Sequence, residues 1–167
     1  GVTFSLWERC VLIPVELYLF CRKIWWIFPV IFLVSGLSYE FFSLTQSLSR
    51  GAVGSLAVIT GGVAGAVFVP LLLPWIPTRG FALKGSITGL LFSLAFLQLF
   101  QIESLLESLS IAMVMTAVSS YLAMNFTGST PFTSPSGVEK EMKIGLPVQL
   151  LALTVGALLW LISPFIQ

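Results

Sequence analysis

The chain has 167 residues, of which 57% are apolar and only 9% are charged. Soluble domains usually carry about 25% charged and about 45–50% apolar residues, so this composition excludes a water-soluble core. The net charge of +1 also argues against nucleic acid, which requires a basic face. Five membrane spans of roughly 20 residues each would account for the apolar content. We therefore expect an all-α, polytopic membrane protein that has the lipid bilayer among its partners.

Residue types that are missing exclude several kinds of chemistry. The chain has no histidine, and all seven of its acidic residues are glutamate. This excludes zinc sites built on imidazole, serine–histidine and cysteine–histidine couples, and an aspartyl dyad. We expect no catalysis by this chain alone.

Residues 1–23 are predicted to form an amphipathic helical segment that leads into the membrane. Pro14 interrupts this segment and is expected to kink it. The order of charges and apolar residues does not fit a cleavable signal peptide, and the start at Gly1 suggests a piece of something longer or a processed start. Arg22 and Lys23, followed by Trp25 and Trp26, are typical of the boundary between headgroups and hydrocarbon.

Long apolar runs then predict a bundle of five transmembrane helices at about residues 24–42, 52–73, 81–100, 106–124 and 146–162. A polar loop at 43–50 separates the first two spans. Prolines at 70, 74 and 77 end the second span and shape the turn that follows it. A longer polar loop, 125–143, precedes the fifth span.

The distribution of Lys and Arg predicts an orientation. With a cytoplasmic N-terminus, the cytoplasmic segments hold Arg9, Arg22, Lys23, Arg79, Lys84, Lys140 and Lys143. The outer segments hold only Arg50, which is a strong positive-inside bias. Five spans then leave Gln167 outside, and the loop 125–142 faces the cytoplasm.

Small residues recur at helical spacing in two spans. Ala57, Gly61 and Gly65 lie at i, i+4 and i+8, and Gly85 and Gly89 at i and i+4. Residues of this size allow helix backbones to approach closely. We expect them to mediate packing within the bundle, with a homo-oligomer interface as the alternative.

The fourth predicted span is unusually rich in hydroxyls and sulfur. It contains Met113, Met115 and Met124 together with Thr116, Ser119, Ser120 and Tyr121. Gap-filling and hydrogen bonds between helices explain such residues. The alternative is that they line a path for a soft ligand.

The loop 125–142 exceeds the usual two to eight residues of a connection between bundle helices, and it concentrates hydroxyl groups. Ser136 and Glu139 have the spacing of a capping box, which predicts that Ser136 caps a short helix. The free N–H groups of such a helix suit an anion or a polar ligand. The alternative is a solvated loop whose hydroxyls bond its own backbone.

Three segments carry a resemblance to a known family. They read YLAMNFTG at 121–128 with TPFTSPSGVEKEM at 130–142, ERCVLIPVEL at 8–17, and PWIPTRGFALK at 74–84. They resemble the C-terminal membrane domain of the mercury-methylating corrinoid proteins (the HgcA family), over essentially the whole chain. The five predicted spans agree with this resemblance.

The resemblance implies a membrane-anchored, corrinoid-dependent methyltransferase of anaerobic bacteria or archaea, in the cytoplasmic membrane. Its cobamide would carry a methyl group from a folate donor to Hg(II). A ferredoxin-like partner with two 4Fe–4S clusters would return cobalt to Co(I). The family's Asn-(Val/Ile)-Trp-Cys-Ala motif is absent, and the sequence contains no Trp-Cys pair. The chain is therefore expected to be the membrane half, without the corrinoid-binding domain.

Two functions follow as expectations. In the first, the chain anchors the corrinoid-binding domain and docks it through the loop 125–142. The candidate cofactor contacts are then Thr127, Thr130, Thr133, Ser134, Ser136 and Gly137. In the second, the chain is a small transporter or conduit that passes Hg(II) or another soft metal inward. Its candidate ligands are Cys10 and Cys21, since thiols bind soft metals. A respiratory anchor subunit without haem is a third alternative.

Overall fold

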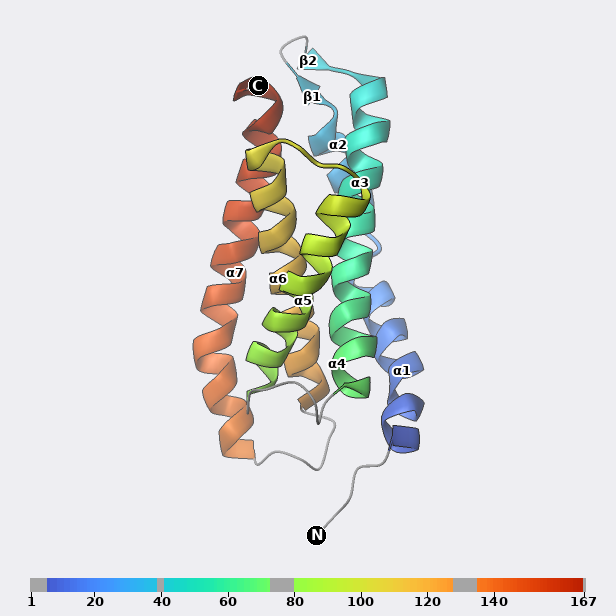
Figure 1. Cartoon of the computed structure of the whole chain (residues 1–167), viewed down its shortest axis with the longest axis vertical. Helices are drawn as coiled ribbons and strands as arrows, with labels where there is room; N and C mark the ends of the chain where they lie inside the picture. Colours follow the sequence, from blue (N-terminus) through green and yellow to red (C-terminus); the bar gives the residue numbers. More distant parts are fainter. Residues whose placement is uncertain (1–5, 39–40, 73–79, 128–134, 167) are drawn as a thin grey trace.

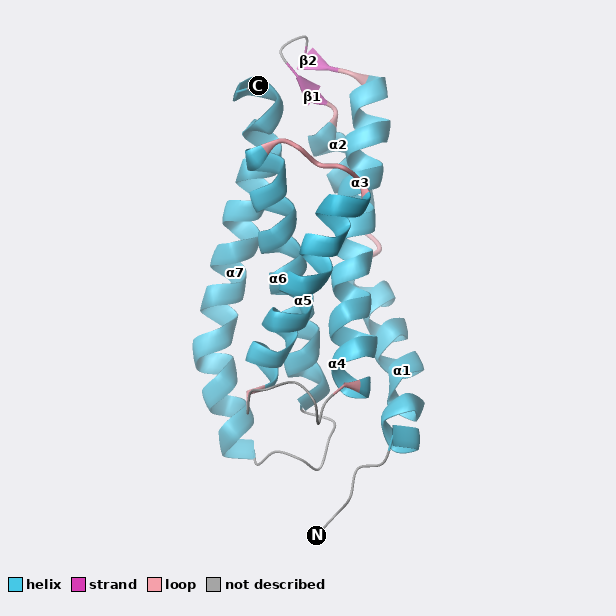
Figure 2. Ribbon diagram, in the orientation of Figure 1, coloured by secondary structure: helices cyan, strands magenta, loops and turns pink. Residues whose placement is uncertain are grey.

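The computed structural model describes residues 6–38, 41–72, 80–127 and 135–166. The described chain is almost entirely helical, and its long helices lie side by side in one bundle (Figures 1 and 2). In chain order the elements are α1 (Leu6–Ile24), α2 (Ile27–Ser35), β1 (Leu37–Ser38), β2 (Phe41–Phe42), α3 (Leu44–Val63), the π-helix η1 (Ala64–Phe68), α4 (Val69–Leu71), α5 (Phe81–Leu99), α6 (Leu105–Thr127) and α7 (Pro135–Ile166). The predicted all-α class is confirmed at this level.

Within the described ranges, four helical segments are long and apolar enough to cross a membrane: Leu44–Leu71, Phe81–Leu99, Leu105–Met124 and Lys143–Ile166. A fifth candidate is the bent pair Leu17–Ile24 and Ile27–Ser35, whose axes differ by 54°. Length and composition therefore describe a protein of the multi-pass membrane class, with four spans or five if the bent pair counts as one.

The first predicted span, 24–42, is wrong as a continuous helix. The helical run stops at Ser35, and the two-residue strands β1 and β2 pair antiparallel, with Leu37 opposite Phe42. Pro14 lies inside α1 without interrupting it, and the chain bends at Trp25 and Trp26 instead. The predicted membrane boundary would place this junction at the end of the bundle. It lies instead about halfway along the bundle (Figure 1). Trp25 and Trp26 are 68% and 56% exposed.

The predicted polar loop 43–50 is also wrong, because α3 begins at Leu44. Ser43 has an extended backbone, and its hydroxyl oxygen accepts a hydrogen bond from the Gln46 N–H at 3.3 Å. This is an N-cap, which satisfies one of the free N–H groups of the first turn. From there α3, η1 and α4 form one 28-residue rod, Leu44–Leu71, which ends two residues before the predicted 73.

Helices α5 and α6 lie close to their predicted positions, whereas α7 begins earlier than predicted. Helix α5 ends one residue before the predicted end of the span 81–100, and α6 covers the predicted span 106–124. Helix α7, however, begins at Pro135 and includes the polar residues that precede the predicted span 146–162. Proline suits the first turn of a helix because its missing N–H would be unpaired there anyway. Ser136 therefore lies inside the first turn of a 32-residue helix and does not cap a short one.

Helix α6 is the centre of the bundle, in contact with α3, η1, α5 and α7. Its backbone meets glycines from two directions. A Cβ atom at Gly61 would lie 3.1 Å from the Cα of Met115, and one at Gly89 would lie 2.9 Å from the Cα of Thr116. The predicted close packing of these small residues within the bundle is confirmed, since it allows helix backbones to touch.

Gly85 provides a test of this packing. A Cβ atom there would lie 2.6 Å from the carbonyl oxygen of Ser119 and 2.6 Å from the Cα of Ser120. Gly85→Ala should therefore force α5 away from α6 and lower the free energy of unfolding by about 1–3 kcal/mol. The matched control is Gly54→Ala, whose nearest atom is a side-chain methyl of Ile31 at 3.0 Å that is able to move. Unfolding in detergent micelles, followed by circular dichroism, measures both. Equal stability of the two variants would contradict the packing argument.

Candidate functional site

The residues predicted to contact a cofactor belong to one end of the bundle, as far as the structure describes them. Thr127 is the last residue of α6, and Ser136 and Gly137 lie in the first turn of α7. Thr130, Thr133 and Ser134 lie outside the described residues. At this same end α1 and α5 begin and α4 ends (Figure 1). The fold therefore gathers the start of α1, the end of α6 and the start of α7 at one end of the bundle.

The predicted soft-metal ligands are not gathered into one described site. Cys10 and Cys21 both belong to the continuous helix α1, and Cys21 is exposed. The side chain of Cys10 lies outside the description. Within the described ranges no group of three or more His, Cys, Asp or Glu side chains could hold a metal ion. A metal role for the two cysteines stays a prediction.

The methionines of α6 point to different parts of the bundle. Met115 is fully buried in the core cluster with Ala57, Phe96 and Trp160. Met113 lines a cavity on another side of the helix. Met124 is buried near Gly145. Gap-filling therefore explains Met115 and Met124, whereas Met113 faces an open space.

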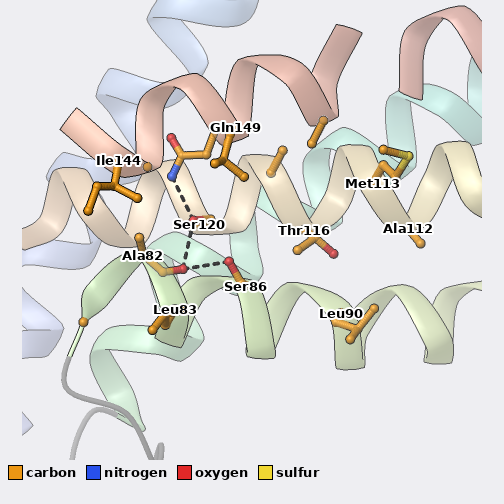
Figure 3. Close-up of a pocket in the computed structure, with 15 residues that line it drawn as sticks. Ala82, Leu83, Ser86, Leu90, Ala112, Met113, Thr116, Ser120, Ile144 and Gln149 are labelled. Carbon is orange, nitrogen blue, oxygen red and sulfur yellow. Dashed lines mark hydrogen bonds between the residues drawn. The ribbon is translucent and has the colours of Figure 1, made fainter. Parts of the chain in front are cut away.

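That space is a groove of about 610 Å³ between α5 and α7, with α6 as its floor (Figure 3). Leu83 and Leu90 form the α5 wall, and Val148 and Ala152 lie on the α7 wall. Four polar side chains lie among these apolar ones, and they are Ser86, Thr116, Ser120 and Gln149. The three helices are all candidate membrane spans, so the groove lies within the apolar part of the bundle.

A chain of hydrogen bonds crosses the groove. The amide nitrogen of Gln149 donates to the Ser120 hydroxyl oxygen at 2.8 Å, and Ser120 donates to the carbonyl oxygen of Ala82 at 2.8 Å. Ser86 donates to the same carbonyl at 2.8 Å (Figure 3). Because the Ser120 proton is used by Ala82, Ser120 can only accept from Gln149. This fixes which end of the Gln149 amide faces Ser120.

Two oxygen atoms of the groove residues have no partner. They are Oε1 of Gln149 and Oγ1 of Thr116, and both atoms are buried. A buried polar atom without a hydrogen bond costs about 1–3 kcal/mol, and the hydrocarbon of a bilayer offers no water to supply one. The groove thus combines apolar walls with unused hydrogen-bonding capacity.

A second polar cluster lies near the opposite end of the bundle, around Arg50. Nε of Arg50 is 3.2 Å from Oε1 of Glu107, and the two side chains are 11% and 21% exposed. The guanidinium also donates to the backbone carbonyls of Ser35 and Trp160 and lies 4.4 Å from the centre of the Trp160 ring. The Trp160 indole N–H in turn donates to the Ser35 hydroxyl at 2.9 Å. This cluster, which we call the Arg50 clamp, joins α2, α3, α6 and α7.

The fold and these two clusters define a helical bundle of the multi-pass membrane type, with a mostly apolar groove that holds four polar side chains and a partly buried charged clamp. No protein-family model, no curated protein and no solved structure matches the chain. The assignment beyond this class therefore depends on the residues themselves.

Sequence reasoning noticed the polar residues of α6 but missed Gln149 and the role of Arg50. Gln149 stands between Val148 and Leu150 in an otherwise apolar stretch, and a lone amide in such a place was the available signal. Arg50 was expected in an outer loop. The N-cap at Ser43 places it inside α3, where it contacts Glu107.

The Arg50 clamp predicts unequal effects of removing its two charged members. Arg50→Ala removes every contact of the guanidinium and should lower the free energy of unfolding by about 3 kcal/mol, since it leaves Glu107 unpaired. Glu107→Ala leaves Arg50 with two carbonyls and the Trp160 ring, so a loss of about 1 kcal/mol is expected. Arg22→Ala, at an exposed cation, is the control and should have little effect. Unfolding in micelles gives the order, and a larger loss for Glu107→Ala would refute it.

Proposed function

We propose that the chain is the membrane domain of a corrinoid-dependent methyltransferase that resembles the mercury-methylating proteins. In this proposal it anchors a corrinoid-binding domain at the cytoplasmic face and docks it through residues 125–142. The parent protein transfers a methyl group from its cobamide to Hg(II), and a ferredoxin-like partner with two 4Fe–4S clusters restores Co(I). The chain itself performs no step of this chemistry.

One observation carries the proposal beyond the sequence resemblance. The start of α1 and the helix ends on both sides of the α6–α7 connection lie at the same end of the bundle (Figure 1). A domain joined ahead of α1 would therefore be next to residues 125–142 without crossing the membrane. This arrangement supports docking, since a short tether gives a high effective concentration.

The positions of the cations also support a cytoplasmic location for this end of the bundle. Lys143 lies in α7 and Lys84 in the first turns of α5, both toward the end where α1 begins. Arg9 belongs to α1, close to its start. Cations near span ends favour the cytoplasm, which supports a cytoplasmic N-terminus in a bacterial or archaeal membrane.

The chain contains no histidine, and of its two thiols only Cys21, in the last turn of α1, has a described side chain. In this proposal the edge of the corrinoid would make polar contacts with Thr127, Thr130, Thr133, Ser134, Ser136 and Gly137. The cobamide itself would be held by the domain that this chain lacks.

Cysteine labelling tests the orientation. In a background with Cys10→Ser and Cys21→Ser, Ser129→Cys should react with a membrane-impermeant maleimide only after the cells are opened. Gln101→Cys, between α5 and α6 at the other end, should react in intact cells or spheroplasts. The reverse pattern would place residues 125–142 outside and would end the docking proposal.

Cofactor retention tests the docking surface. The full-length gene product, taken anaerobically from its own membranes, should show a cobamide absorption spectrum. Thr133→Ala with Ser136→Ala should reduce the cobamide retained per protein several-fold, because two hydroxyl contacts are lost. Thr154→Ala, an exposed hydroxyl bonded to its own helix, is the control and should retain the normal amount. A colourless native product, or equal retention in both variants at normal expression, would refute this function.

A further inference from the structure

Two cations at the junction of α1 and α2 have a chemistry that anchoring does not use. We propose that this junction binds one anionic glycerophospholipid of the surrounding bilayer. The phosphate of the lipid lies at Arg22 and Lys23, and one of its acyl chains lies in a groove between α2 and α7. This site goes beyond the proposed function and does not depend on a corrinoid.

Arg22 and Lys23 lie exposed in the last turn of α1. Within the described ranges, neither side chain makes a hydrogen bond or an ion pair. Both lie about halfway along the bundle, beside apolar candidate spans (Figure 1). A cation at such a depth is costly unless an anion accompanies it. In a bilayer the phosphate of an anionic lipid is the available anion, and basic residues between membrane helices bind such headgroups.

The groove between α2 and α7 begins at this junction and has a volume of about 540 Å³, with α3 and α6 behind it. Its α2 wall consists of Ile27, Val30, Ile31 and Val34, at the spacing of one helix face. Val30, and Leu158 on the α7 wall, are 44% and 53% exposed, so the groove opens to whatever surrounds the bundle. Between candidate spans that surrounding is lipid.

The interior of this groove suits hydrocarbon. None of the sixteen residues that line it is ionisable, and its three polar side chains already have partners. The hydroxyls of Ser110 and Thr154 donate to backbone carbonyls at 2.6 Å and 2.8 Å. The indole N–H of Trp160 donates to Ser35 at 2.9 Å. A polar head placed here would gain no partner, whereas an acyl chain would gain dispersion contacts.

The cations lie next to the end of the groove that Ile27 forms. Lys23 precedes Ile27 by four positions, and the backbone between them stays close to helical. The Trp25 N–H donates to the carbonyl of Cys21 at 3.1 Å, and Trp26 has φ −72° and ψ −20°. Residues four apart on a helix are neighbours. With the 54° bend at this point, about one turn still separates them, and the flexible stem of a lysine spans that distance.

The opposite end of the groove does not suit the phosphate. Arg50 lies at that end beside Trp160, but its guanidinium is already bound to Glu107 and to two backbone carbonyls. A phosphate there would displace Glu107 and leave its charge unpaired. The lipid therefore lies with its phosphate toward α1 and its chain toward Trp160.

Native mass spectrometry of the full chain in a mild detergent tests the site. The probes are dioleoylphosphatidylglycerol, which is anionic, and dioleoylphosphatidylcholine, which has the same chains but no net charge. We expect saturable binding of the first at a single site, about tenfold tighter than binding of the second, because two cations favour an anionic head. No saturable binding, or equal affinity for the two lipids, overturns the proposal.

Arg22→Gln combined with Lys23→Gln tests the head of the lipid. Both side chains are exposed, so the fold should not change. The affinity for dioleoylphosphatidylglycerol should fall about tenfold, to that of dioleoylphosphatidylcholine. Lys143→Gln, at an exposed cation near the end of the bundle, is the control and should change the affinity less than twofold. An unchanged affinity in the double variant refutes the proposal.

Ala157→Phe tests the chain of the lipid, because Ala157 is exposed on the α7 wall and a ring there would fill the groove. Binding of both lipids should weaken at least tenfold. Ala52→Phe, at an exposed alanine of α3 that lines neither groove, is the control and should leave binding unchanged. Tight binding of dioleoylphosphatidylglycerol to Ala157→Phe would refute the groove. A lipid-free dimer that this variant abolishes would assign the groove to a second copy of the chain and also overturn the proposal.

Discussion

The contact on which the bundle depends is the approach of the α6 backbone to the glycines of its neighbours. Gly61 and Gly65 meet it from the α3–η1 rod, and Gly85 and Gly89 meet it from α5. Between helices in lipid the hydrophobic effect contributes little, so van der Waals packing and hydrogen bonds must hold them together. With glycine at these positions, the helices can stay close without large side chains between them. The same closeness brings the hydroxyls of α6 within reach of α5 and α7.

The polar groups along α6 serve two different purposes at its two ends. At one end Glu107 joins the Arg50 clamp, in which each charged group has partners. Thirteen positions further on, about 20 Å along the helix, Ser120 belongs to a hydrogen-bond chain that leaves Gln149 with an unpaired oxygen. A cluster that satisfies its own groups is suited to stabilising the fold. The second cluster, in contrast, leaves hydrogen-bonding capacity unused.

Much of this arrangement could be predicted from the sequence, and the failures have identifiable causes. The apolar runs of α5 and α6 are bounded by polar or proline-containing segments, so their positions were correct to within a few residues. The first residues of α3 are polar, and their helical state depends on the Ser43 cap and on tertiary contacts of Arg50, which hydropathy does not register. The glycine spacing predicted close packing, but it could not tell which helix would receive each glycine. The pairing of Ser120 with Gln149 joins residues 29 positions apart and required the fold.

The break between α1 and α2 has a consequence for the lipid itself. Helix α2 has nine residues and is about 14 Å long, whereas the hydrocarbon core of a bilayer is about 30 Å thick. On this side of the bundle, the exposed cations Arg22 and Lys23 lie in the last turn of α1, just before the two exposed indoles, at the junction about halfway along the bundle. On the opposite side apolar helices continue for their full length. In a bilayer, the two cations beside α2 would draw headgroups and water inward, whereas the apolar length of α7 would not. The protein would then impose an asymmetric depression on the membrane beside the junction of α1 and α2.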